Sequence, residues 1–345
     1  MRFAILFSIL LSLCSSVFAS DEWMQKQISE DLTPFQNGFC SNCMIKYFEE
    51  NKDDQQLCLF SITNNKIKCR RSRNIPADNQ RLIAIHWSLR EIAKKSGLPD
   101  AVFVVSLHDS LDIPSPYPIF VMSKKIGDQK VLFPDFEALV SRYQVINGVN
   151  LETTDFHIPW AKRRNKLIWR GSGAQGDITP ENMHTKSRVL LCQLGREYPS
   201  LINAGFTRHI PPCLEQYRKD HLSFEAIFSY KYQIWLDGNA ASYSNSGWRL
   251  YTGSTVIKTD SNNIQWYYAE LKPWVHYVPV KENLENLVET LLLLKDNEPL
   301  AMEIGANGLQ FAREHISKQQ NLKYFSDLIW AYSTCPTSSP SCTCQ

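Results

Sequence analysis

Two aspartates follow an apolar run in the first third of the chain and could act as a general base. Residues 101–107, Ala-Val-Phe-Val-Val-Ser-Leu, have the composition of a strand buried on both faces of a parallel sheet. Asp109 and Asp112 come directly after this run, at the carboxyl end where open parallel sheets bind ligands. A carboxylate there could accept the proton of an attacking hydroxyl. Aspartates also cap turns after strands, and position alone favours that second interpretation.

A glycine-containing loop in the middle of the chain could receive a phosphate. Arg170-Gly171-Ser172-Gly173 follows an expected strand over 166–170 and precedes an expected helix over 180–195. Glycine lets the backbone approach a phosphate, and a helix N-terminus with an arginine favours its negative charge. The loop has neither the Walker spacing nor G-x-G-x-x-G, so the signal is weak. The small-residue turn from Asp237 to Ser242 also fits an ordinary loop.

Several other chemistries are disfavoured by what the sequence lacks. It contains no Asp-x-Asp, the pair with which manganese-dependent transferases hold a diphosphate. It also contains no Ser-centred G-x-S-x-G and no H-E-x-x-H. Two short basic runs, 66–73 and 162–166, occur in a chain of net charge +2, so they fit solvated faces better than a nucleic-acid site.

The elements that would position these residues alternate between helix and strand. Leu82, Ile85, Leu89 and Ile92 recur at helical spacing and predict a helix over 81–97, with Gly97 as its stop. In the second half, Thr179 and Pro180 fit the N-cap and first position of the helix over 180–195. A further helix is predicted by one apolar stripe, formed by Leu284, Leu287, Val288, Leu291 and Leu292. Three short apolar runs predict strands over 117–122, 254–258 and 276–280.

Length and composition indicate an α/β protein of two domains. A chain of 345 residues with 43% apolar residues can bury a sizeable core but exceeds what one core usually serves. The helix–strand pattern restarts after residue 160, which places a boundary near 150–165. Residues 1–19 are typical of a signal peptide cleaved near Ala19, and an uncleaved anchor is the alternative. No later segment predicts a membrane span.

The ten cysteines fit an exported protein. Cys14 belongs to the expected signal peptide, and most of the other nine cluster toward the two ends, which favours disulfides that hold the termini to the body. Cys40-x-x-Cys43 and Cys342-x-Cys344 could bind zinc instead, but no nearby pair of histidines completes a set of four ligands. Because nine is odd, at least one thiol is free or pairs between chains.

The stretch from Trp160 to about Ile316 resembles glycosyltransferase family 90, the protein O-glucosyltransferases (Rumi-like) and capsule-associated glycosyltransferases. Upstream, Glu30–Phe35 is similar to a segment near the start of the mature O-glucosyltransferases. The resemblance is carried by Ile168-Trp-Arg-Gly-Ser172, Ser187-Arg-Val-Leu-Leu191, Tyr230-Lys-Tyr232 with Asp237-Gly238, and Leu271-Lys-Pro-Trp-Val-His-Tyr-Val-Pro-Val280.

The resemblance implies a GT-B fold, in which two Rossmann-like domains face each other across a cleft and the C-terminal helix crosses back to the first domain. It implies an acceptor-side domain over 20–160, with 317–345 packing back on it, and a UDP-sugar-binding domain over 161–316. The implied reaction is inverting transfer of glucose or xylose from UDP-glucose or UDP-xylose, without a metal or other cofactor. The acceptor would be a serine of a protein domain, possibly EGF-like, or a glycan.

The resemblance also assigns roles to individual residues. His108-Asp109 with Pro114 matches the spacing around the family's general base, so Asp109 takes that role and Asp112 does not. Ser172 and Arg188 match ligands of the donor diphosphate. The residues that match the nucleotide cradle are Gly238, Asn239, Ala240, Ala241 and Ser242. Arg170 and Arg249 are assigned to the donor with less support.

One departure from the family pattern leaves a second function open. The O-glucosyltransferases have an arginine where this chain has Ser244 or Asn245, and the nearest arginine here is Arg249. A non-catalytic, lectin-like or pseudo-enzyme member that binds a glycan or a folded domain is therefore the alternative. A UDP-sugar donor and a signal peptide together imply the lumen of the endoplasmic reticulum or Golgi, or secretion.

Overall fold

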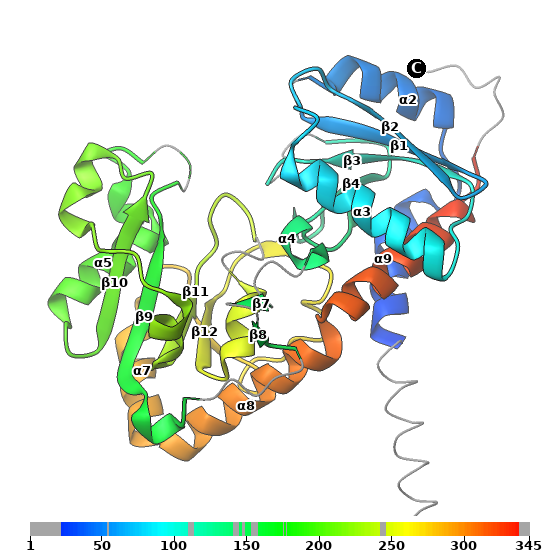
Figure 1. Cartoon of the computed structure of the whole chain (residues 1–345). Coiled ribbons are helices and arrows are strands. Elements are labelled where there is room, and N and C mark those ends of the chain that lie inside the picture. The colour runs from blue at the N-terminus through cyan, green and yellow to red at the C-terminus, as the bar shows by residue number, and fades with distance from the viewer. Residues whose placement is uncertain are drawn as a thin grey trace, which may run out of the picture. The chain divides into compact units, whose positions relative to one another are not determined.

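A computed structural model describes residues 22–337, apart from 54, 110–113, 141–144, 147–148, 153–157, 175, 177 and 242–245 (Figure 1). These residues form two compact units, of which unit 1 lies within 1–139, 265–270 and 319–345, and unit 2 within 140–264 and 271–318. The expected signal peptide and several singled-out residues lie outside the described residues: Asp112, Ser242, Ser244, Asn245, Cys342 and Cys344. The expected domain limits and GT-B arrangement stay predictions.

Unit 1 contains a mixed five-stranded sheet with the strand order β2-β1-β3-β4-β6. β3 pairs antiparallel with β1 and parallel with β4, so the expectation of a parallel sheet around 101–107 is correct on one side of this strand only. The strands are β1 (Leu57–Thr63), β2 (Lys66–Arg71), β3 (Ala101–Ser106), β4 (Ile119–Val121) and β6 (Val131–Leu132).

A tight hairpin joins β1 to β2. Its two turn residues, Asn64 and Asn65, have φ angles of 50° and 61°, as a type I′ turn requires. The first basic run forms β2, whose residues are exposed or half-buried, at the edge of the sheet. These cations therefore belong to a solvated edge strand.

The helices of unit 1 include the one predicted over 81–97, which is α3 (Gln80–Lys95). All four predicted apolar positions of α3 are buried, and the Asn79 side chain caps its first turn by accepting from the backbone N–H groups of Arg81 and Leu82. Gly97 follows with a φ angle of 72°. The other helices of unit 1 are one over 22–32, η1 (Thr33–Phe35), α2 (Ser41–Asn51), α4 (Phe136–Leu139) and α9 (Lys318–Ser333).

Asp31 ties the helix over 22–32 to the sheet of unit 1. Its side chain is 3% exposed, and Oδ2 accepts from the Leu132 backbone N–H at 2.7 Å. Oδ1 accepts from Gln27 Nε2 at 3.0 Å and from Lys124 Nζ at 2.6 Å. Burial raises the pKa of the Asp31 carboxyl, although these donors oppose the shift. This aspartate lies in the Glu30–Phe35 segment that carries the family resemblance.

Unit 2 contains a five-stranded sheet in which every pairing is parallel, with the order β10-β9-β11-β12-β14. The strand order reverses between β9 and β11, which makes the carboxyl ends of these strands a topological switch point. The strands expected over 166–170, 254–258 and 276–280 are present as β9 (Arg164–Ser172), β12 (Thr255–Thr259) and β14 (Val278–Val280). The other two strands of the sheet, β10 (Ile202–Arg208) and β11 (Tyr230–Trp235), were not predicted.

The start predicted for the helix over 180–195 is wrong. α5 begins at Ser187, and Thr179 is not its N-cap. Thr179 instead closes a turn, because its backbone N–H donates to Asn182 Oδ1 at 3.0 Å and its carbonyl accepts from the Met183 N–H at 2.9 Å. The helices of unit 2 are η3 (Met183–Thr185), α5 (Ser187–Glu197), α6 (Phe224–Phe228), α7 (Leu287–Asp296) and α8 (Glu298–His315).

The apolar stripe predicted for the helix that follows β14 is correct in part. Leu287 and Leu291 of α7 are buried, together with Leu294, whereas Leu292 is 46% exposed. Leu292 is five residues beyond Leu287, which turns it off the buried face of a 3.6-residue helix. Leu284 precedes α7 and has a φ angle of 60°.

The remaining elements are short. Among the described residues, every helix is too short or too polar to cross a membrane. The short elements are β5 (Lys124–Lys125), β7 (Val145–Ile146), β8 (Val149–Asn150), β13 (Asn263–Ile264), η2 (Trp160–Lys162), η4 (Pro212–Tyr217) and η6 (Gly247–Thr252).

Candidate active site

Two loops were singled out in the second half of the sequence: the first loop, residues 170–173, and the turn over 237–241. Both follow neighbouring strands of the unit 2 sheet. Ser172 ends β9, and the turn over 237–241 follows β11. β9 and β11 pair in parallel, so the two loops emerge at the same edge, at the switch point of the strand order. Open α/β sheets bind their ligands at this edge.

The two glycines of the first loop are required by crowding. A Cβ atom on Gly171 would lie 2.3 Å from Trp169 Cζ2, and one on Gly173 would lie 2.3 Å from the His209 carbonyl oxygen. The Gly173 N–H also donates to the Arg208 carbonyl at 3.0 Å. Packing against β10 and Trp169 therefore explains these glycines without a ligand.

Arg188 joins the two loops from α5. Its side chain is 2% exposed. Nη1 donates to the carbonyls of Ser172 and Ala174, both at 3.0 Å, and Nε donates to the Asp237 carbonyl at 3.2 Å. These contacts hold the loops in place, as a positioning residue would. Direct binding of a diphosphate by Arg188 stays a prediction.

The turn after β11 has further ties to the first loop. Asn239 Oδ1 accepts from the Gly176 N–H at 2.6 Å, and the Gly238 N–H donates to the Ala240 carbonyl at 3.2 Å. Ala240 and Ala241 are buried. The structure thus brings together five predicted donor residues with Arg188: Ser172, Gly238, Asn239, Ala240 and Ala241. The sixth, Ser242, lies outside the described residues.

The Ser172 hydroxyl has a partner that the sequence did not indicate. Its Oγ accepts from the Ala174 N–H at 3.0 Å and lies 3.2 Å from His209 Nδ1. His209 has a φ angle of 46°, which is uncommon for a residue with a side chain. The imidazole and the Ala174 amide together fix the orientation of the hydroxyl.

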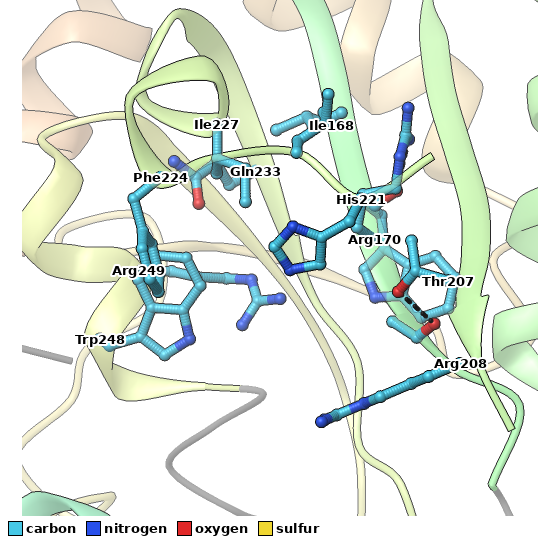
Figure 2. A pocket seen from close by; sticks show the side chains of 13 residues that line it. Ile168, Arg170, Thr207, Arg208, His221, Phe224, Ile227, Gln233, Trp248 and Arg249 are labelled. Carbon is cyan, nitrogen blue, oxygen red and sulfur yellow. Dashed lines mark hydrogen bonds between the residues drawn. The ribbon is translucent and has the colours of Figure 1, made fainter. Parts of the chain in front are cut away.

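Arg170 and Arg249 line a cavity of about 210 Å³ beside the first loop (Figure 2). The Arg170 guanidinium donates hydrogen bonds to protein acceptors, including the Asn203 carbonyl at 3.0 Å, and burial lowers the pKa of Arg170. Arg249 is 6% exposed, and its guanidinium lies 4.9 Å from the Trp248 ring centroid. Arg208, the register partner of Ser172, also lines the cavity.

Asp109 belongs to unit 1 and follows β3 as predicted. Its side chain is 42% exposed, and Oδ1 accepts from Arg81 Nη2 at 2.5 Å. Arg81 Nη1 donates to the Leu107 carbonyl at 2.5 Å, and its guanidinium lies 5.2 Å from the Phe136 ring centroid. Arg81 therefore anchors one oxygen of Asp109 to the end of β3.

A sequence profile of glycosyl transferase family 90 matches residues 18–343. The chain belongs to glycosyl transferase family 90. The resemblance found in the sequence is confirmed.

The matched relatives of this family 90 chain include protein O-glucosyltransferases. Protein O-glucosyltransferase 2 of Danio rerio is 27% identical over 328 residues, which cover 91% of this chain and 63% of that protein. Human protein O-glucosyltransferase 1 is 25% identical over 334 residues, covering 89% of this chain and 78% of that protein. The chain thus spans between about two thirds and four fifths of these relatives.

One solved structure, the S. aureus MnaA–UDP co-structure, is 13% identical to this family 90 chain. It matches 64% of this chain and 57% of its own, with a TM-score of 0.32. A likeness at this score carries no argument about ligands.

Several polar residues near the first loop and the turn over 237–241 were not predicted from the sequence. Arg208, His209 and His221 lie in irregular or edge positions, where residue type carries no periodic signal. Gln233 offered a signal, because it is a neutral polar residue inside the apolar run of β11. Among the described residues there is no group of three or more His, Cys, Asp or Glu side chains that could hold a metal ion. Cys40 and Cys43 are disulfide-bonded.

Proposed function

We propose that this chain is an inverting glycosyltransferase that moves glucose or xylose from a UDP-sugar to a hydroxyl of a protein serine or a glycan. The observation that carries the proposal is the pair of loops at the β9–β11 switch point, joined by Arg188 and by Asn239. The protein O-glucosyltransferase names of the matched relatives support the same reaction. The GT-B arrangement and action in the secretory lumen or after secretion are parts of this proposal.

On the donor side, the first loop and the turn over 237–241 receive the diphosphate. As the bond between the sugar and UDP breaks, negative charge builds on the departing phosphate. The Ser172 hydroxyl, fixed by Ala174 and His209, and the nearby guanidinium of Arg208 stabilise that charge. Because groups of the protein supply this stabilisation, the proposed reaction needs no metal.

On the acceptor side, Asp109 acts as the general base. Arg81 occupies Oδ1, so Oδ2 of this partly exposed carboxylate accepts the proton of the acceptor hydroxyl. The hydroxyl oxygen forms a bond to the anomeric carbon as the bond to the UDP oxygen breaks on the opposite face. The product sugar therefore has inverted configuration, and UDP leaves with the bonding electron pair.

The experiment is to incubate the purified chain with UDP-glucose, UDP-xylose and other UDP-sugars and to measure UDP release with and without acceptor. We expect release with UDP-glucose or UDP-xylose, undiminished by excess EDTA. Loss on chelation, restored by manganese, would contradict the metal-free mechanism. UDP binding without any turnover would favour the non-catalytic alternative.

Arg188→Ala tests the junction of the two loops. We expect UDP affinity to fall about tenfold or more, because a guanidinium that holds three carbonyls or a phosphate contributes roughly 1.5–3 kcal/mol. Titration calorimetry with UDP measures the change. Arg196→Ala in the same helix is the matched control, since Arg196 contacts only Gln216 Oε1 among hydrogen-bond acceptors of the described residues. An affinity within twofold of wild type would remove Arg188 from the site.

A further inference from the structure

We propose that Cys58 and Cys69 are the site of a disulfide that fastens the edge strand β2 to β1, formed by reaction with a thiol–disulfide oxidant. Both residues are free thiols in the structure. They belong to neighbouring antiparallel strands of the unit 1 sheet, which Figure 1 shows side by side. The inference goes beyond the proposed glycosyl transfer and does not depend on it.

The register of the β1–β2 hairpin places the two cysteines on the same face of the sheet. Cys58 lies opposite Arg71, and Phe60 lies opposite Cys69, so the cysteines are diagonal neighbours across the ladder. Phe60, on that same face, packs against His86 of α3 with 5.8 Å between the ring centroids. The thiols therefore lie on the face of the hairpin that α3 covers.

The two thiols are already in contact. They form a side-chain hydrogen bond with each other, so little movement separates this arrangement from a covalent bond. β2 is the outermost strand of the sheet and pairs only with β1. A small shift of β2 that closes the bond therefore leaves the pairing of the other strands unchanged.

The surroundings of the two thiols give each a different part in the reaction. Cys58 is 0% exposed, whereas Cys69 is half-buried. The hydrogen bond with Cys58 lowers the pKa of the Cys69 thiol, burial opposes this shift, and the positive charge of Arg71 supports it. The hydrogen bond with Cys69 and burial raise the pKa of the Cys58 thiol. Because the thiolate is the attacking form, Cys69 reacts first with the oxidant.

Two exchange steps with glutathione disulfide complete the bond. The Cys69 thiolate attacks one sulfur of the oxidant, which forms a mixed disulfide and releases one glutathione thiolate. Cys58 then loses its proton, attacks the Cys69 sulfur and releases the second glutathione. The two cysteines lose two electrons and two protons, and one glutathione disulfide becomes two glutathione thiols. Compartments of the secretory pathway supply such an oxidant.

A cross-link suits this strand because β2 has few other contacts that hold it. Ile67 and Cys69 are its half-buried residues, and the other four are exposed, so little apolar burial stabilises it. Cys58 is also the register partner of Val105 in β3, close to the end of the strand that Asp109 follows. The disulfide would thus secure the edge of the sheet that carries the candidate base.

The test is peptide mapping of the purified chain after incubation with glutathione disulfide. Remaining thiols are blocked with N-ethylmaleimide in denaturant before digestion with trypsin. Cleavage at the basic residues of β2 places Cys58 in peptide 53–66 and Cys69 in peptide 69–70. We expect mass spectrometry to find these two peptides joined, and to find them separate after reduction. Recovery of both as N-ethylmaleimide adducts, or joined to other cysteines, would overturn the proposal.

Thermal unfolding with and without dithiothreitol gives a second readout. We expect the reductant to lower the melting temperature of wild type by about 5 °C or more beyond its effect on Cys69→Ala, because a disulfide restricts the unfolded chain. The Cys40–Cys43 disulfide is reduced in both proteins, so its contribution cancels. Cys213→Ala, at another half-buried free thiol, is the matched control and should respond as wild type does. Equal responses of wild type and Cys69→Ala would contradict the proposal.

Both readouts omit donor and acceptor, so they can fail without affecting the proposed transfer reaction. The peptide map uses the wild-type chain and therefore stands even if Cys69→Ala does not fold.

Discussion

Asp31 and Asp109 are two aspartates of unit 1 with opposite surroundings. Asp31 is 3% exposed and accepts hydrogen bonds on both oxygens from Gln27, Lys124 and Leu132. Asp109 is 42% exposed and accepts from Arg81 on one oxygen. The Asp31 carboxylate is fully engaged in contacts within the core, whereas the Asp109 carboxylate has one oxygen that can contact a reagent.

The difference shows what a motif match can and cannot decide. Both aspartates lie in segments that resemble the family, at Glu30–Phe35 and at His108–Pro114. The contacts separate their roles, because a carboxylate that is buried in the core and held by three donors cannot be reached by a reagent. We therefore expect stability to depend on Asp31 and catalysis on Asp109.

The largest effect is expected for Asp109→Asn. Removing a general base lowers the transfer rate by about 10²–10⁴, while UDP affinity and thermal stability should stay close to wild type. Asp78→Asn, an exposed position in the same unit, is the control. Initial-rate assays measure the change. Near-full activity of Asp109→Asn would abolish the contrast between the two aspartates.

Asp31→Asn should act on stability. An amide NH₂ in place of either oxygen would face the Leu132 N–H or the Lys124 and Gln27 donors, leaving buried donors unpaired. The expected loss in the free energy of unfolding is about 1–3 kcal/mol. Urea unfolding measures it, with activity per folded molecule as the second readout. A stable variant with impaired turnover would mean that the roles are reversed.

Arg81→Ala sharpens the assignment of Asp109. Without the guanidinium, Oδ1 loses its anchor to the end of β3, and we expect the transfer rate to fall about tenfold through misplacement of the base. Arg81→Lys should recover part of the rate, because an ammonium can still reach one of the two acceptors. A merely structural role would instead lower both variants in stability and spare the rate per folded molecule.

The smallest effect concerns pH and Asp31. Burial raises the folded-state pKa of Asp31 above its unfolded value near 3.8, so the folded state binds this proton more tightly. The contribution of Asp31 to stability is therefore fully present below the unfolded pKa and decreases as pH rises through the folded pKa. The gap in unfolding free energy between wild type and Asp31→Asn should widen as pH falls from 7 toward about 4. A constant gap across this range would contradict the direction of the shift.

Much of the fold followed from periodicity and composition. The four apolar positions of α3 and the buried runs of β3, β9 and β12 were readable because each element buries a face with a regular pattern. The hairpin of β1 and β2 was missed, although Asn64-Asn65 between two strands is itself a turn signal. The start of α5 was misplaced because the Asn182 side chain closes a turn that propensity does not reveal.

The site was less accessible from the sequence. Resemblance pointed to the residues of both loops, but the role of Arg188 depends on which carbonyls surround it, and these come from β9 and from the turn after β11. Gln233, a polar residue in the apolar strand β11, was not singled out from the sequence. Its orientation depends on Ser254 and Arg163, which are distant in sequence. Hydrogen bonds between residues distant in the sequence produce no periodic pattern of residue types, so the sequence alone does not predict them.

The hairpin edge formed by β2 has a consequence for how copies of this chain meet. An open edge strand offers unpaired backbone groups to any other strand and invites polymerisation. Here Lys66, Lys68 and Arg71 are exposed on β2, while Arg70 pairs with Glu49 at 2.7 Å, so a second β2 would still bring cation against cation. Like charges placed directly opposite oppose strand pairing. The charges of β2 therefore oppose pairing between the β2 edges of two copies of this chain.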